Sequence, residues 1–87
     1  MKNTAAEKQV VGLKESKRAL LKGQVKRLII AEDAQDHVIE PLLQIARQNS
    51  VEVFYVDSMK ALGKQYGIGL KAAAVAILKD VVDETPL

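Results

Sequence analysis

The sequence predicts an α/β fold in which a sheet lies between helices, a three-layer α/β/α sandwich. Strand-like and helix-like segments alternate along most of the chain, and this order places helices on both faces of a sheet. The chain has 87 residues, enough for one hydrophobic core and hence for a single domain spanning 1–87. Hydrophobic residues make up 48% of the chain and aromatic residues only 3%, so we expect an aliphatic core.

The first predicted elements are a short edge strand at 10–11 and a helix bracketed by Gly12 and Gly23, preceded by a loose tail at 1–9. Glycine readily adopts the left-handed conformation that ends helices, so Gly23 marks the end of this one. Lys22 lies in the last turn, where a cation interacts favourably with the negative end of the helix dipole.

One face of this helix carries most of its charge. Successive residues are rotated by about 100°, which brings four charged side chains onto one outward arc: Lys14, Glu15, Arg18 and Lys22. Leu13 and Leu20 point the opposite way, toward the core. Free backbone N–H groups at a helix N-terminus favour anions. The charged face is therefore either an ordinary solvated surface or a phosphate-binding surface whose carboxylate reads a base.

The second predicted pair is a central strand at 25–31 and a helix at 37–49, joined by a polar loop. The second half of the strand is continuously apolar and rich in β-branched residues, which is typical of a strand covered on both faces. We expect Asp36 to cap the helix. Pro41 lacks a backbone N–H and crowds the preceding turn, so either the first turn is irregular or the regular helix starts later than Asp36.

The third predicted pair is a strand at 51–56 and a short helix at 59–66. Valine, phenylalanine and tyrosine dominate the strand, and these residue types favour extended backbone. Asp57 or Ser58 can cap the helix, and Gly67 ends it.

The C-terminal part of the sequence permits two interpretations. Residues 72–82 are rich in alanine and form a good helix by intrinsic propensity. By length, 72–78 can equally be a buried strand followed by a short helix at 79–84. Periodicity alone does not separate these alternatives for a short apolar run. We expect 83–87 to be a loose tail.

Charge is distributed unevenly along the chain. Residues 1–30 contain eight basic and two acidic residues, whereas 31–87 contain five basic and nine acidic ones. A basic first third on a slightly acidic body suits a polyanion that docks on one side. A net charge of only +2 argues against non-specific coating of nucleic acid.

The sequence offers little for catalysis, so we expect no enzyme, no catalytic residue, no metal and no cofactor. His37 is the only histidine and lies beside acidic residues at a helix start, where an exposed turn residue is the simpler interpretation than a general base. Without cysteine, only a carboxylate metal site remains, and a solvated loop explains its candidates better: Glu32, Asp33 and Asp36.

Two glycines near the end of the chain do not form a dinucleotide-binding motif. Gly67 and Gly69 lack a third glycine at the right spacing and do not lie between a strand and a helix in the required order. The stretch Gly69-Leu70-Lys71 nevertheless allows close backbone approach to a ligand and puts an apolar residue beside a cation. Taken alone, it is either an ordinary surface turn or a second contact loop.

The sequence also indicates where the protein works. Its longest unbroken apolar run, 72–78, is far too short to span a bilayer. No apolar run follows the N-terminal charges in the manner of a signal peptide, and no cysteine is present. We expect a cytoplasmic protein with no membrane partner, and nothing demands more than a monomer.

Four stretches are informative in combination: Gly-Leu-Lys-Glu-Ser-Lys-Arg at 12–18, Leu-Ile-Ile-Ala-Glu-Asp-Ala at 28–34, Val-Asp-Ser-Met-Lys-Ala-Leu-Gly at 56–63 and Gly-Ile-Gly-Leu-Lys-Ala-Ala-Ala-Val-Ala-Ile at 67–77. Over roughly residues 10–82 the chain resembles the L7Ae/L30e ribosomal protein family, in particular its short bacterial members. The resemblance implies an α/β/α sandwich in which 72–78 is a strand, giving a small mixed sheet of about four strands.

Members of that family bind kink-turns in RNA, so the resemblance implies a non-catalytic RNA-binding protein with a kink-turn partner, which can be ribosomal RNA. Glu15 matches the family glutamate that accepts hydrogen bonds from a guanine, and Arg18 matches a basic position near the RNA. Lys14 departs from the asparagine common in archaeal and eukaryotic members, and a lysine donates but does not accept. The expected RNA-binding residues are Gly12, Leu13, Lys14, Glu15, Lys17, Arg18, Lys22, Gln35, Gly69, Leu70 and Lys71.

Two other classes of function remain open at this level. The basic helix face could instead meet an acidic protein, which would make the chain a protein–protein adaptor without a specific RNA target. A small enzyme of nucleotide metabolism is the third alternative, although no set of catalytic residues supports it.

Overall fold

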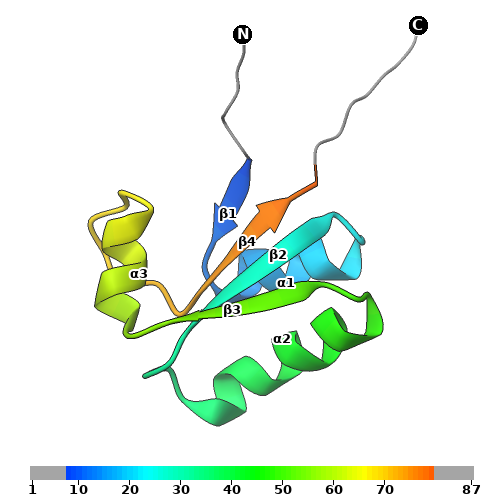
Figure 1. The fold of residues 1–87 in the computed structure, drawn as a ribbon, viewed down its shortest axis with the longest axis horizontal. Helices are drawn as coiled ribbons and strands as arrows, with labels where there is room; N and C mark the ends of the chain where they lie inside the picture. The colour runs from blue at the N-terminus through cyan, green and yellow to red at the C-terminus, as the bar shows by residue number, and fades with distance from the viewer. Residues whose placement is uncertain (1–7, 80–87) are drawn as a thin grey trace, which may run out of the picture.

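The computed structural model describes residues 8–79. They form seven elements, in the order β1 (Gln9–Val11), α1 (Leu13–Leu21), β2 (Val25–Ala31), α2 (Asp36–Gln48), β3 (Glu52–Val56), α3 (Met59–Gln65) and β4 (Ala74–Leu78) (Figure 1). The predicted tail at 83–87 and most of the alternative helix at 79–84 lie outside the described residues. Of the predicted N-terminal tail, Gln9 belongs to β1, where it pairs with Ile77.

The four strands form one mixed sheet in the order β1-β4-β2-β3. β2 and β3 are parallel, whereas β4 runs antiparallel to both of its neighbours. The C-terminal apolar run is therefore a strand, as the family resemblance implied, and the helix favoured by its composition is wrong. The reason is its position: Ala74, Val75 and Ala76 are completely buried between two neighbouring strands.

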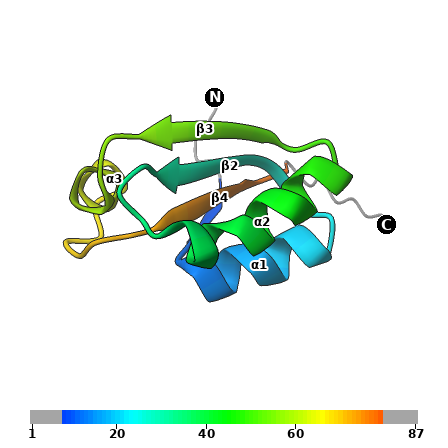
Figure 2. The same ribbon diagram turned by 90° about the horizontal axis from the view of Figure 1, so that it is seen from below.

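Two of the three helices share one side of the sheet. Figure 2 shows α1 and α2 side by side below the strands, with α3 apart from them at the end where β2 and β3 finish. The predicted α/β sandwich with a four-strand mixed sheet is confirmed. The core is aliphatic, as expected, and its largest fully buried hydrophobic side chains are Leu20, Leu28, Ile30, Leu62, Ile77, Val25 and Val75.

Helix α1 has the limits that its glycines predict. Gly12 precedes it with φ 107° and Gly23 follows it with φ 69°, both values that favour glycine. Leu20 is buried and Leu13 packs half-buried against the core, while the charged side chains face outward. Asn49 at the end of α2 donates a side-chain hydrogen bond to the Leu20 carbonyl over 3.3 Å, which fastens the two helices together.

Helix α2 begins at Asp36 and not one residue later. The predicted capping role of Asp36 is wrong, because Gln35 occupies the cap with an extended backbone and no side-chain capping bond is made. The helix continues through Pro41. Val38 and Ile39 both donate to the Gln35 carbonyl, over 3.0 and 3.2 Å, a shared acceptor that is common at helix ends and includes the regular α-helical bond. The expected later start of the helix is therefore wrong, and this shared bond is no sign of the irregular first turn expected from the proline.

Helix α3 begins at a serine cap. The Ser58 hydroxyl accepts a hydrogen bond from the Ala61 N–H over 3.0 Å, which decides between the two predicted caps. Gly67 follows the helix with φ 68°, as expected for its end. The predicted start of α3 at 59 is confirmed, and the helix ends at Gln65, one residue before the predicted end.

The buried hydroxyl of Ser16 yields a stability prediction. Ser16 is completely buried on α1, and its Oγ has no hydrogen-bond partner among the described residues. An unsatisfied buried hydroxyl destabilises the folded state, and alanine is also the better helix former. We expect Ser16→Ala to raise the free energy of unfolding by about 1 kcal/mol in urea denaturation.

Ser58→Ala is the matched control, because it removes a hydroxyl that caps α3. Loss of such a cap costs about 1 kcal/mol, so the two serine substitutions should have opposite signs. If Ser16→Ala destabilised the protein as much as Ser58→Ala does, the Ser16 hydroxyl would have a partner after all.

Candidate functional site

Three connections of the fold meet at one end of the sheet. They are the turn at Gly12 between β1 and α1, the loop 32–35 between β2 and α2, and the loop 66–73 between α3 and β4 (Figures 1 and 2). The Gly12 N–H donates to the Ala74 carbonyl over 2.8 Å, so the α1 N-terminus lies directly beside the end of the 66–73 loop. The fold thus brings together segments that are some 60 residues apart in sequence.

Hydrogen bonds also hold the other two connections in place. The Asp33 carboxylate accepts from the Met59 N–H over 2.7 Å, which ties the 32–35 loop to the start of α3. The Met59 carbonyl in turn accepts from the Ala72 N–H over 3.0 Å. Ala31 donates to the Ala73 carbonyl over 3.0 Å. The three connections consequently form one continuous surface.

The α1 N-terminus presents a carboxylate among cations. Lys14, Glu15, Lys17 and Arg18 are all exposed. One Glu15 carboxylate oxygen lies 3.9 Å from an Arg18 guanidinium nitrogen, and the two side chains are 53% and 58% exposed. An ion pair this long and this exposed holds its members weakly, so the Glu15 carboxylate stays available as an acceptor. Gly12 at the cap has no side chain to satisfy the first N–H groups of the helix.

The remaining predicted residues differ in their placement. Leu13 is half-buried, so its contribution to this surface is chiefly structural. Gln35 is exposed in the loop before α2. Figure 2 shows this connection between β2 and α2 at the same end of the sheet as the α1 N-terminus. Gly69, Leu70 and Lys71 are exposed there too, and Leu70 is 74% exposed.

Lys22 is the residue that the structure separates from the others. It follows the last turn of α1, about 12 Å further along the helix axis than the first turn. It shares the outward stripe with Lys14 and Arg18, as the 100° rotation predicted, but it lies away from the three connections. A ligand that reaches Lys22 must therefore follow the length of the helix.

A basic groove between α3 and the 66–73 loop extends this surface. It has a volume of about 940 Å³ and is lined by Lys60, Lys64, Gly67, Gly69, Leu70 and Lys71. Sequence reasoning singled out the loop residues but missed Lys60 and Lys64. Their spacing of four on a short helix puts both on one face, and that spacing is the signal that could have found them.

Gly63 fixes the distance between α3 and this loop. A Cβ atom on Gly63 would lie 1.6 Å from the Leu70 carbonyl oxygen, far inside van der Waals contact. Only glycine therefore allows the loop backbone to pack directly on the helix, and this contact holds Leu70 and Lys71 over the groove.

The described residues show few features of other kinds of site. Between residues 8 and 79 no group of three or more histidine, cysteine, aspartate or glutamate side chains is arranged to hold a metal ion. No helix in that part of the chain is long and apolar enough to cross a membrane. His37 is exposed in the first turn of α2, as the sequence suggested.

The fold and this surface define a small α/β domain with a basic, loop-built face at one end of its sheet. Residues 1–84 match the model of the Ribosomal protein L7Ae/L30e/S12e/Gadd45 family. The chain belongs to that family, as its motifs indicated.

Several bacterial relatives are similar over nearly their whole length. The chain is 47% identical over 74 residues to the RNA-binding protein YbxF of Geobacillus stearothermophilus, covering 85% of this chain and 90% of that one. It is 36% identical over 77 residues to an RNA-binding protein of Caldanaerobacter subterraneus, covering 88% and 90%. A Bacillus halodurans protein of unknown function has a similar fold, with a TM-score of 0.74 at 22% identity over 82% of this chain and 71% of that one.

The contact at Gly63 gives a prediction about how the surface is held. Replacing a helical glycine by alanine ordinarily stabilises a helix by about 1 kcal/mol. Here we expect Gly63→Ala to lower the free energy of unfolding by about 1–3 kcal/mol, because the new methyl group overlaps the Leu70 carbonyl. Amide hydrogen exchange should also become faster at Leu70 and Lys71.

Lys60→Ala on the exposed side of the same helix is the control, with an expected change within about 0.5 kcal/mol. A stabilising Gly63→Ala with unchanged exchange in the loop would show that the loop does not need this close contact.

Proposed function

We propose that this chain is a non-catalytic RNA-binding protein that recognises and stabilises a kink-turn. The observation that carries the proposal is the meeting of the α1 N-terminus with the 66–73 loop through the bond from Gly12 to Ala74. This meeting puts an accessible carboxylate, several cations and an exposed leucine on one surface. Relatives of similar length that carry the name RNA-binding protein support the same conclusion.

The α1 N-terminus suits the open guanine edges of sheared G·A pairs. Ionised Glu15 only accepts hydrogen bonds, which matches the N1–H and N2–H donors of guanine. Arg18, Lys14 and Lys17 then contact phosphates on either side of the base, together with the free N–H groups of the helix. A distorted, widened groove at a kink admits a helix end that a regular A-form groove excludes.

The 66–73 loop and the basic groove complete the interface. Leu70 is exposed enough to pack against unstacked bases at the bulge. Lys60, Lys64 and Lys71 line the groove beside it and suit the flanking phosphates. Gln35, in the 32–35 loop, contacts a base that is turned out of the RNA stack. Lys22 contacts RNA only if the RNA backbone runs along α1.

The proposed setting follows from the same features. The protein acts as a monomer in the cytoplasm, since one copy supplies the whole surface. Ribosomal RNA is the leading candidate for the RNA that contains the kink-turn. A protein–protein adaptor with a basic helix face is the competing function, and the RNA experiments below distinguish it.

Glu15→Ala tests the base contact. The loss of a good bidentate contact to a base edge costs about 1–3 kcal/mol, or roughly 5- to 150-fold in affinity. We expect this weakening in gel-shift titrations against a kink-turn RNA. The matched control is Glu52→Ala, which removes an exposed carboxylate from β3 and should leave the affinity unchanged.

The same titrations against an RNA whose sheared G·A pairs are made Watson–Crick test the shape requirement. Wild-type protein should bind this RNA much more weakly, and Glu15→Ala should reduce the difference between the two RNAs. Equal wild-type affinity for both would contradict kink-turn recognition and leave polyanion binding only. An absence of binding to either RNA would favour the adaptor.

Lys60 and Lys64 test the groove. If each contacts a phosphate, replacing both by alanine should reduce the slope of log K against log salt by about 2. Discrimination between the two RNAs should persist. Lys79→Ala is the control, because Lys79 is exposed after β4 at the opposite end of the sheet. An unchanged slope in the double variant would remove the groove from the interface.

A further inference from the structure

We propose that the free edge of β3, with the hollow between β3 and α2, binds an extended basic segment of a partner protein. The hollow adjoins the 32–35 loop of the basic face, because Glu32 and Ala34 also line it, but the proposal does not depend on RNA binding. It rests on three properties of the same edge: unpaired backbone groups, an apolar hollow and a cluster of carboxylates around that hollow.

The first property is the open edge of the sheet. Among residues 8–79, β3 is the last strand in the order and pairs only with β2. The Val56 carbonyl accepts from the Glu32 N–H over 2.8 Å on the β2 side. Because backbone groups alternate in direction along a strand, Val53 and Tyr55 point their N–H and C=O groups to the free edge. Such an edge is a template for another strand.

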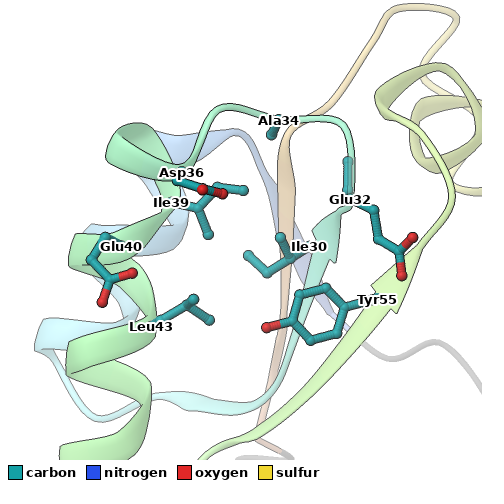
Figure 3. A pocket seen from close by; sticks show the side chains of 9 residues that line it. Ile30, Glu32, Ala34, Asp36, Ile39, Glu40, Leu43 and Tyr55 are labelled. Atoms are coloured by element: carbon teal, nitrogen blue, oxygen red, sulfur yellow. The ribbon is translucent and has the colours of Figure 1, made fainter.

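The second property is the hollow beside this edge. It has a volume of about 450 Å³ and lies between α2 and the sheet. Figure 3 shows Ile30 and Leu43 facing each other across it, with the Tyr55 ring on the sheet side. Tyr55 is 53% exposed, so this side of the hollow is accessible from solvent. The aliphatic stem of an arginine or lysine side chain, three or four carbons long, can pack on this apolar surface.

The third property is the charge around the hollow. Within the part of the chain that the structure describes, three carboxylates and no basic residue line it: Glu32, Asp36 and Glu40. Figure 3 places Glu40 on α2 and Glu32 beside Tyr55, so the carboxylates flank the apolar residues from both sides. Glu40 has one cation nearby, Arg47, at 3.9 Å, but both side chains are more than half exposed and the pair is weak.

One extended segment with an arginine side chain can occupy both the edge and the hollow. Directly opposed residues of paired strands place their side chains on the same face of a sheet. Tyr55 faces the hollow, so a partner residue opposite Tyr55 also points there (Figure 3). An arginine at that position lays its methylenes on Ile30 and Leu43 and its guanidinium against the carboxylates. RNA is unsuited to this edge, because its phosphates would meet those same carboxylates.

The test uses the full chain and a fluorescein-labelled peptide of alternating arginine and valine. Fluorescence anisotropy should show saturable binding, and the Val53 and Tyr55 amides should gain protection from hydrogen exchange. The same peptide N-methylated at alternate backbone nitrogens keeps the charge but loses strand pairing, so it should bind at least about tenfold more weakly. Equal binding of the two peptides would overturn strand addition.

Charge reversal tests the hollow. Glu40→Lys should weaken the arginine peptide about tenfold or more. Glu52→Lys is the matched control, with the same change in net charge on the opposite face of β3, and it should have a much smaller effect. Equal weakening by both variants would overturn the hollow as the arginine site and indicate attraction by net charge alone.

Two further measurements exclude other occupants. Sedimentation velocity without peptide should show a monomer, and a dimer that resists the peptide would assign the edge to a second copy and overturn the proposal. Kink-turn RNA affinity should be the same for Glu40→Lys and wild type. Its loss would place the hollow in the RNA interface and also overturn the proposal, whereas failure of RNA binding in the wild type leaves the peptide test unaffected.

Discussion

The structure depends on the position of β4, which lies between β1 and β2. This strand runs antiparallel to both, and four of its five residues are almost completely buried. Without this strand, β1 would have no partner in the sheet and α1 would lose a strand on which it packs. The same position brings the 66–73 loop to the α1 N-terminus through Gly12 and Ala74. The pairing of β4 that completes the sheet therefore also assembles the basic face.

Small residues let this assembly happen at close range. Alanines at 74 and 76 on the central strand leave room for the helix layer beneath it, and Gly63 lets the Leu70 carbonyl sit directly on α3. The polar contact from Asp33 to the Met59 N–H then fixes the third connection. The contact between Asp33 and Met59 joins residues 26 positions apart, and the contact at Gly63 holds the loop on the helix that precedes it, so the surface presents a fixed arrangement of side chains to a ligand. A fixed arrangement lowers the ordering cost of binding.

Local sequence signals were sufficient where the decisive interaction is itself local. Gly23, Ser58 and Gly67 determine helix limits through their own backbone preference or a contact three residues away, and the limits beside them were predicted to within one residue. The outward stripe of α1 also follows from rotation alone. The start of α2 was not predicted correctly, because the cap is Gln35, whose side chain makes no capping hydrogen bond.

Non-local contacts explain what the sequence alone left open or missed. The alanine-rich run at 72–78 has the composition of a helix, and only pairing with β1 and β2 makes it a strand; the family resemblance supplied that information indirectly. The spacing of Lys60 and Lys64 puts them on one face of α3, but they join the basic face only because the 66–73 loop folds back over that helix. The separation of Lys22 from that face is likewise visible only once the connections are placed.

Charges of opposite sign lie on different surfaces of the fold. The basic face combines the α1 N-terminus, from the basic first third of the chain, with Lys60, Lys64 and Lys71 from α3 and the 66–73 loop, whereas carboxylates from the β2–α2 region gather along the β3 edge. Fields of opposite sign on one small domain orient a polyanion during its approach, because the wrong orientation is repelled. The carboxylates at the β3 edge would repel the phosphates of an RNA bound at the proposed interface. If both proposals hold, the edge stays open to a basic segment while RNA occupies the basic face, and the two surfaces act at the same time.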